Sequence, residues 1–424
     1  MYARKRLDVG WKDLVSGLVA CASSLDERAP RERIERAFSS RGEALATLSV
    51  RSGLDLFLSE KALPAGSEVL MSALTIPDMW RIVEHHGLVP VPVDLDPRTL
   101  APSASSLEAA ASPRTRALVL AHLFGARIDL GPVAKLARSR GWLLLEDCAQ
   151  SWTGDADRGS PLADVSMFSF GPIKTAAALA GGVLVVRDPE VVARMRARQE
   201  AWPLQSRRKY FTRTLKYAGL VAITKCATYA AFAKGCDLAG KDLDAMIQGS
   251  VRGFAGGDFF EKIRHRPSPA LLSTLARRIE RSNAWRVDGR VARARRFLAR
   301  LPDGVLVPGA ANAFHSFWVF TVLVEEPDRV VAELRASGFD ATRVASLRAV
   351  PVPAGRPDLE PREALRILAR TVYLPCYPEM PERAVDAMAD ALAKAVRAGR
   401  EKRGGEVRLR PAPASPALAP RPRR

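Results

Sequence analysis

One lysine stands alone in a stretch of apolar and small residues, MFSFGPIKTAAALAGG, at residues 167–182. Lys174 is its only charged residue, and the pair Gly181-Gly182 closes it. Burial in such surroundings lowers the pKa of a lysine, and the neutral amine can then form a Schiff base with a carbonyl compound. The glycine pair would let the backbone approach a planar cofactor. The alternative is a surface lysine at a turn, and this stretch alone does not decide between the two.

A carboxylate and an amide follow an apolar run upstream of this lysine. In LLLEDCAQS, Asp147 comes directly after an expected strand, and Gln150 follows three residues later. A carboxylate there could pair with a protonated pyridine nitrogen, the interaction that lets pyridoxal phosphate act as an electron sink. Gln150 could reach the ring hydroxyl of the same cofactor. Asp147 could instead be a helix N-cap or a turn residue.

The stretch SVRSGLDLFL, residues 49–58, is a candidate phosphate site. Ser52 and Gly53 are expected to open a helix over Leu54–Leu63. A hydroxyl, free backbone N–H groups and the positive end of the helix dipole would together bind a phosphate. Ser52 could equally be an ordinary N-cap serine. Ser169, at the end of SMFSF, could add another hydroxyl.

The elements that must position these residues alternate between short apolar strands and helices. Strands are expected at Glu68–Met71, Leu88–Val93, Ala117–Ala121, Trp142–Glu146, Ser166–Phe170 and Val183–Val186, with helices at Asp78–His86 and Gly131–Arg140. Continuous apolar strands separated by helices indicate an α/β fold with a largely parallel sheet covered on both faces. In such sheets ligands bind outside the carboxyl ends of the strands, where Asp147 and the loop of Lys174 are expected.

The pattern changes near residue 300. Strands are expected at Phe317–Val324 and Thr371–Leu374, and helices at Asp328–Ser337 and Pro381–Arg397. We therefore predict a large domain over residues 1–300 and a smaller C-terminal α+β domain over residues 301–398.

The net charge of +19 comes mostly from two segments. Residues 399–424 carry +6 in a stretch rich in Pro, Ala and Arg, and we predict a disordered tail there. Such a tail could bind an acidic surface, such as anionic lipid or nucleic acid, but a solvated tail is the simpler interpretation. Residues 205–266 carry +7. The charge therefore says little about the rest of the chain.

The second basic segment contains Tyr217–Ala233, which is apolar nearly all round apart from Lys225. A run of this length with an internal lysine makes a poor membrane span. It could be an interfacial helix on anionic lipid. The favoured interpretation is a helix buried against the body of the protein or against a partner subunit.

The first residues and the cysteines bear on the cell compartment. The start of the chain, MYARKRLDVGWKDLVSGLVACASS, has basic residues and only a short apolar run, so an amphipathic first helix is favoured over a signal peptide. The five cysteines are scattered, without a C-x-x-C pair. Neither a disulfide framework nor a metal site is expected, and a cytoplasmic protein is predicted.

Several stretches together carry a resemblance to a known family. They are HGLVPVPVDLDPRTL, LAHLFGARIDLGPVAKLARSRGWLLLEDCAQS, FSFGPIKTAAALAGGVLVV, HSFWVFTVLVEEPDRVVAELRASGFDATR and LPCYPEMPERAVDAMADAL. In these stretches, about residues 30–204 and 262–395, the chain resembles the DegT/DnrJ/StrS family of pyridoxal-phosphate-dependent sugar aminotransferases. The resemblance implies the type I aminotransferase fold, pyridoxal 5'-phosphate as cofactor, and an active site at a homodimer interface. It also implies transfer of an amino group from an amino acid such as glutamate to a keto sugar, nucleotide-linked, in polysaccharide or amino-sugar biosynthesis.

The resemblance assigns roles to single residues. Lys174 matches the lysine that carries the cofactor and moves the proton, which argues against the dehydratase branch with histidine at this place. Asp147 matches the residue on the pyridine nitrogen, and Gln150 the residue near the ring oxygen. Ser52, Gly53 and Ser169 match phosphate contacts.

This chain departs from the family pattern around the expected substrate side. Ile76 stands where an aromatic residue usually stacks on the cofactor ring, and Ala180 replaces a glutamate before the glycine pair. Arg264 stands where a partner-subunit asparagine usually reaches the phosphate. Residues 205–261 have no counterpart in compact family members. These differences leave the identity of the sugar open more than the chemistry.

Two other functions remain open at this stage. A pyridoxal-phosphate enzyme for a bulky or lipid-linked substrate at the membrane surface would use the apolar, basic insertion. A non-catalytic regulator or nucleic-acid binder on the same fold would use the basic tail, but it would not need a Schiff-base lysine. His122 and His315 are expected to be structural residues at strand ends.

Overall fold

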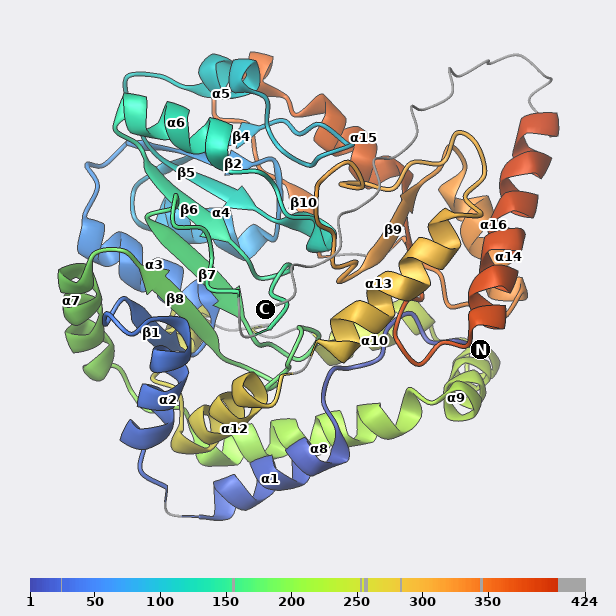
Figure 1. The fold of residues 1–424 in the computed structure, drawn as a ribbon, viewed down its shortest axis with the longest axis horizontal. Coiled ribbons are helices and arrows are strands. Elements are labelled where there is room, and N and C mark those ends of the chain that lie inside the picture. The colour runs from blue at the N-terminus through green and yellow to red at the C-terminus, as the bar shows by residue number, and fades with distance from the viewer. Residues whose placement is uncertain are drawn as a thin grey trace.

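The computed structural model describes residues 1–23, 25–154, 157–251, 254, 258–282, 284–343 and 346–402. Its largest feature is a seven-stranded sheet in the order β1-β8-β7-β6-β5-β2-β4 (Figure 1). The strands are β1 (Ala44–Thr47), β2 (Glu68–Ser72), β4 (Val89–Val93), β5 (Thr115–Ala121), β6 (Leu143–Asp147), β7 (Val165–Ser169) and β8 (Gly182–Val186). Only β8 runs against its neighbours β7 and β1, which confirms the predicted mostly parallel α/β sheet.

Helices cover both faces of this sheet because its strands are apolar on both sides. Leu45 of β1 points into one apolar cluster and its neighbours Ala44 and Ala46 into another. The first cluster is covered by α3 (Val50–Lys61), α4 (Pro77–His85) and α7 (Pro189–Glu200). The opposite face is covered by α5 (Ala104–Ala110), α6 (Gly131–Arg140), α2 (Arg28–Phe38) and α12 (Pro269–Glu280).

Helix α3 begins earlier than expected. Ser49 is its N-cap, and its hydroxyl accepts a hydrogen bond from the backbone N–H of Ser52. Ser52 and Gly53 therefore lie inside the first turn rather than ahead of the helix. Ser49 caps the N–H of Ser52, the third residue of the helix. The backbone N–H groups of the first two residues, Val50 and Arg51, have no carbonyl partner within the helix.

The insertion at residues 205–261 forms a series of helices rather than one. They are α8 (Arg207–Ile223), α9 (Cys226–Leu238), α10 (Leu243–Val251) and α11 (Phe259–Ile263). The expected single helix over Tyr217–Ala233 is broken between α8 and α9, where Lys225 is extended and caps α9. Helix α8 lies beside α1 (Trp11–Ala22), along the lower edge of Figure 1. Among the described helices, none is both long and apolar enough to cross a membrane.

The C-terminal part packs as a separate layer on the right of Figure 1. Its elements are α13 (Trp285–Leu298), β9 (Phe320–Leu323), α14 (Pro327–Ala336), α15 (Arg362–Arg370), β11 (Thr371–Leu374) and α16 (Glu382–Lys402). Phe297 of α13 packs in the same cluster as Phe320 and Leu392, so this layer takes in residues before the expected boundary at 300. Two short pieces join the layers, β3 (Leu74–Thr75) paired with β10 (Arg348–Ala349). Most of the predicted tail, residues 403–424, lies outside the described residues.

The first residues of the chain cross between the layers. Tyr2 stacks on Phe339, and Arg4 forms an ion pair with Asp340, so residues 2–4 belong to the C-terminal layer by contact. Asp8 instead binds the large layer, where it accepts hydrogen bonds from the backbone N–H groups of Ala176 and Ala177. The N-terminal segment, residues 1–8, therefore links the two layers next to Lys174.

Candidate active site

Asp147 is the last residue of β6, at the carboxyl edge of the sheet. Burial raises the pKa of its carboxyl group, and the N–H of Ala149 and the nearby charge of Lys174 partly oppose this shift. Its Oδ1 accepts the Ala149 N–H at 2.9 Å. Asp147 is partly buried. A carboxylate that is partly removed from water favours a positively charged partner, and a protonated ring nitrogen would supply one.

Below Asp147 lies a set of buried polar groups that bond to each other. His122 and Glu146 are joined at 2.8 Å, and the His122 Nδ1 accepts the N–H of Ile128. Glu146 also accepts from Ser160 and Ser166, and its pKa falls to about 2 because these bonds outweigh the cost of burial. The set braces the end of β6, and we assign no metal to it.

Lys174 sits in the turn that follows β7, partly buried. Burial lowers the pKa of its amine to about 8; the charge of Asp147 opposes the shift and that of Arg51 adds to it. Its Nζ lies 4.2 Å from the centre of the Trp318 ring. The lowered pKa expected from the apolar and small neighbours of Lys174 is therefore explained by its partial burial.

The backbone after Lys174 is held by residues from distant parts of the chain. Ala176 and Leu179 adopt left-handed φ angles of 51° and 67°, which disfavour any residue except glycine. The hydroxyl of Tyr210 donates to Ala178 O at 2.9 Å, and Arg213 donates to Leu179 O at 3.2 Å. Both come from α8, so part of the insertion holds the lysine loop in place.

Gly181 and Gly182, which close this loop, were expected to let the backbone approach a planar cofactor; in the structure their contacts are with protein. Gly181 has a φ of 98°, which glycine adopts at little cost. A Cβ on Gly182 would lie 2.7 Å from the backbone of Ser49 and Val50. The close approach predicted from the glycine pair is present, but it is an approach of β8 to the start of α3.

The predicted phosphate residues lie near each other but point differently. The Ser52 hydroxyl donates to Ile263 O at 2.7 Å, and a Cβ on Gly53 would meet the side chain of Leu184. Their role as phosphate contacts stays a prediction, since both face protein. Ser169 is the last residue of β7 and is partly buried there. Gln150 accepts the N–H of Phe124 at 2.8 Å, so its side-chain oxygen already holds the loop after β5.

Arg51 is a residue that the sequence analysis missed. It occupies the first turn of α3, its charge acts on both Lys174 and Asp147, and its Nε bonds Asp78 at 2.6 Å. Arg264, which the resemblance placed at the phosphate, is instead held by both oxygens of the buried Asp55. Ile76 is the N-cap residue of α4 and packs against apolar neighbours.

A second cationic group lies beside Lys174. The Lys5 amine donates to Trp318 O at 3.1 Å and lies 3.8 Å from the centre of that ring, which Lys174 also contacts. Arg290 is 8% exposed; its Nε donates to Ser316 O, while its buried Nη2 has no hydrogen-bond partner among the described residues. Burial, Arg290 and Lys174 lower the pKa of Lys5 well below its usual value. This cluster can accept an anion.

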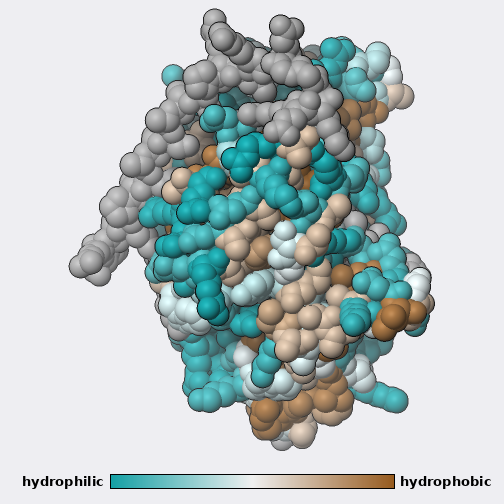
Figure 2. Space-filling model, turned by 90° about the vertical axis from the view of Figure 1, so that its right-hand side faces the viewer, coloured by the Kyte–Doolittle hydropathy of each residue, from teal (hydrophilic) through white to brown (hydrophobic). Residues whose placement is uncertain are grey.

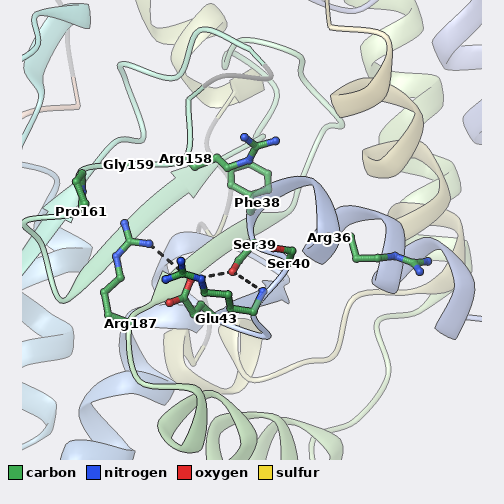
Figure 3. A pocket seen from close by; sticks show the side chains of 10 residues that line it. Arg36, Phe38, Ser39, Ser40, Glu43, Arg158, Gly159, Pro161 and Arg187 are labelled. Atoms are coloured by element: carbon green, nitrogen blue, oxygen red, sulfur yellow. Dashed lines mark hydrogen bonds and ion pairs between the residues drawn. The ribbon is translucent and has the colours of Figure 1, made fainter.

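A pocket lies elsewhere, at the end of α2 (Figure 3). Its volume is about 460 Å³, and it is lined by Phe38, Glu43, Arg158 and Arg187 among others. Arg187 reaches Ser160 O and faces Glu43, and Arg158 bonds Ala37 O, so these guanidinium groups have protein partners. None of the predicted site residues lines it.

Comparison with known proteins connects this geometry with a family. Residues 30–225 match the DegT/DnrJ/EryC1/StrS aminotransferase family. The match covers a little under half of the chain, and over these residues the chain is similar to the family. Aminotransferases of the DegT/DnrJ/EryC1/StrS family depend on pyridoxal phosphate. The partly buried Asp147 carboxylate and the Lys174 amine are groups of the chemical kind that such a cofactor needs.

Two relatives illustrate the range of similarity. The GDP-perosamine synthase of Caulobacter vibrioides is 35% identical over 156 residues, which are 36% of this chain and 42% of that protein. The dTDP-4-dehydro-2,3,6-trideoxy-D-glucose 4-aminotransferase of Saccharopolyspora spinosa is 26% identical over 80% of this chain and 82% of its own length. The more similar alignment thus spans less than half of the curated relative.

Solved structures share the fold over nearly the whole chain. The aminotransferase TlmJ from Streptoalloteichus hindustanus has a TM-score of 0.66 and 22% identity, covering 92% of this chain and 97% of that one. The ntda structure from Bacillus subtilis, with bound PMP, has a TM-score of 0.66 and 16% identity, covering 92% and 83%. The type I aminotransferase fold predicted from the resemblance is therefore confirmed.

Proposed function

We propose that the protein is a pyridoxal-phosphate-dependent aminotransferase that moves an amino group from glutamate to a keto sugar carried on a nucleotide. The observation that carries this proposal is the electrostatic pairing of Lys174, whose pKa is lowered to about 8, with Asp147, a partly buried carboxylate at the end of β6. The names of the curated relatives, which include a GDP-perosamine synthase, support a nucleotide-linked acceptor. We place the reaction in the cytoplasm and expect a homodimer.

The residues would divide the work as follows. Bound pyridoxal phosphate supplies an electron sink for the bond that breaks at the donor's α-carbon. Asp147 would hold a proton on the ring nitrogen. Burial raises the pKa of its carboxyl group by disfavouring the charged form, and a cationic partner would stabilise that form again. Lys174 Nζ would take the proton from the donor's α-carbon and return it, since an amine with a pKa of about 8 can do both near neutral pH.

Cations on two sides would hold the anionic groups. Arg51 and the N–H groups at the start of α3 would bind the phosphate, and the Ser169 hydroxyl at the end of β7 would add a further contact. Lys5 and the unpaired Nη2 of Arg290 would bind a carboxylate of the amino donor. The Trp318 ring would cover the Lys174 amine and keep water from it.

The test is amino transfer from the donor in the absence of an acceptor. The protein is loaded with cofactor and incubated with L-glutamate, and 2-oxoglutarate is measured. One equivalent per site is expected, with further turnover only after a keto-sugar nucleotide is added. Lys174→Ala should release none. A wild-type protein that is loaded with cofactor but forms no 2-oxoglutarate or other keto acid from any amino acid tested would refute the proposal.

A further inference from the structure

The outer face of α1 is unusually apolar for a surface. Trp11, Val15 and Val19 recur at helical spacing and are all exposed, while Leu14 and Gly17 on the opposite side are buried. A ladder of this kind on a surface helix usually packs against something. In the described part of the chain nothing covers it.

The neighbouring helix continues this face. A Cβ on Gly17 of α1 would lie 3.7 Å from Thr214 of α8, so the two helices are in contact. Helix α8 exposes Phe211 and Leu215, one turn apart. Figure 2 shows apolar side chains gathered at the lower end of the molecule, the end where α1 and α8 lie in Figure 1.

The charges on this face have one sign. Exposed cations on and beside the two helices are Lys12, Arg207, Arg208, Lys209 and Lys216. The one carboxylate within α1 and α8, Asp13, is buried and paired with Arg277 and Arg278. The face therefore presents aromatic and aliphatic side chains among cations, with no exposed acid in either helix.

From this combination we propose that the outer face of α1 and α8 binds an anionic lipid surface. Tryptophan, phenylalanine and aliphatic side chains enter the boundary between headgroups and acyl chains, and lysine and arginine bind the anionic headgroups. A second copy of the chain fits less well, because a two-fold interface would place these cations opposite the same cations with no acid to pair them. The inference does not depend on the aminotransferase activity.

The proposed lipid-binding face lies on a helix that also contacts the loop of Lys174. The same helix α8 holds the loop after Lys174 through Tyr210 and Arg213. In a protein bound to lipid through α1 and α8, the loop after Lys174 would therefore be in contact with a helix that also contacts the lipid.

The experiment is co-sedimentation of the full chain with vesicles of phosphatidylcholine, with and without phosphatidylglycerol. Binding is expected only to the anionic vesicles, and it should weaken as salt is raised. The double variant Trp11→Ser/Phe211→Ser should bind about ten-fold more weakly or worse. A matched control is Trp285→Ser/Leu365→Ser, because Trp11 and Trp285 are 51% and 50% exposed and Phe211 and Leu365 are 38% and 40% exposed.

Four results would overturn the inference. Equal binding to neutral vesicles, or equal loss in both double variants, would remove the role of this face. Loss of binding in Arg421→Ser/Arg423→Ser/Arg424→Ser with no loss in Trp11→Ser/Phe211→Ser would assign the contact to the tail. Dissociation of a dimer by Trp11→Ser/Phe211→Ser, seen by analytical ultracentrifugation, would make the face a subunit interface. Circular dichroism of each variant checks that it is folded.

Discussion

The Lys174 amine combines two opposing effects. Burial favours its neutral form and Asp147 favours its charged form, and the net result is a pKa of about 8. An unshifted lysine would be almost wholly protonated at neutral pH. At this value a useful fraction is neutral, while the protonated form is still present to return a proton.

This balance predicts a pH dependence. Because the neutral amine is the nucleophile, the rate at which pyridoxal phosphate is captured on Lys174 should rise with pH and level off above about 8. The rate is read by reduction with borohydride after short incubations, followed by mass spectrometry of the peptide containing Lys174. Lys174→Arg is the control and should give no adduct at this position. A rate that keeps rising up to the ordinary lysine pKa of 10.5 would contradict the effect of burial.

The positions of single residues could be predicted from the sequence where the neighbouring residues determine them. Asp147 could be placed because it follows an apolar strand, and Lys174 because its neighbours are dry. Arg51 was not predicted as a site residue, because its position near Lys174 depends on where α3 begins. The spacing of Ser49 and Ser52, three residues apart, could have indicated that the helix begins after Ser49. Lys5 and Arg290 had no such signal, because only the fold brings them to Trp318.

At the scale of elements, the start of α3 is set by its contact with β8. Gly182 ends the lysine loop, and its missing side chain is what allows the strand to approach Ser49 and Val50. The strands and the helix Gly131–Arg140 could be read from apolar runs and from glycine and proline at their ends. The break between α8 and α9 could not, because apolar residues continue through it and only Lys225 marks the position.

Gly182→Ala tests the contact between β8 and α3. A Cβ 2.7 Å from backbone atoms of Ser49 and Val50 forces the two elements apart, so we expect a loss of about 1–3 kcal/mol in the free energy of unfolding. The affinity for pyridoxal phosphate should fall as well. Urea unfolding and cofactor titration measure the two effects.

Gly235→Ala is the control for this substitution. Gly235 lies within α9 and a Cβ there meets nothing within 4 Å, so the change should stabilise the protein by about 0.5–1 kcal/mol through helix propensity. Equal effects of the two substitutions would contradict the role given to Gly182.

At the scale of the whole molecule, Asp340 joins three distant segments. It is fully buried and accepts hydrogen bonds from Arg4 at 2.7 and 2.8 Å and from the hydroxyl of Tyr229. The N-terminal segment, the insertion and the C-terminal layer therefore meet at one carboxylate. Such a junction between residues hundreds of positions apart cannot be read from sequence periodicity.

Asp340→Asn should destabilise the protein by about 1–3 kcal/mol, because it removes one of the two carboxylates that pair with the partly buried guanidinium of Arg4; the other is Asp244. Thermal unfolding measures the change. Asp328→Asn is the matched control: its pair with Arg343 is largely exposed, at 82% for Asp328, and should change stability by about 0.5 kcal/mol or less. A loss for Asp340→Asn no larger than for Asp328→Asn would show that the junction adds little.

The N-terminal segment also constrains the order in which the protein can mature on the ribosome. Arg4 and Asp340 are 336 residues apart, and Asp8 contacts Ala176 and Ala177. At about 5–20 residues per second, Arg4 must wait on the order of tens of seconds for Asp340 to be synthesised. Until then Lys5 lacks Trp318, and the lysine loop lacks its link to the C-terminal layer. Stable cofactor capture should therefore follow the synthesis of the segment that contains Trp318 and Asp340.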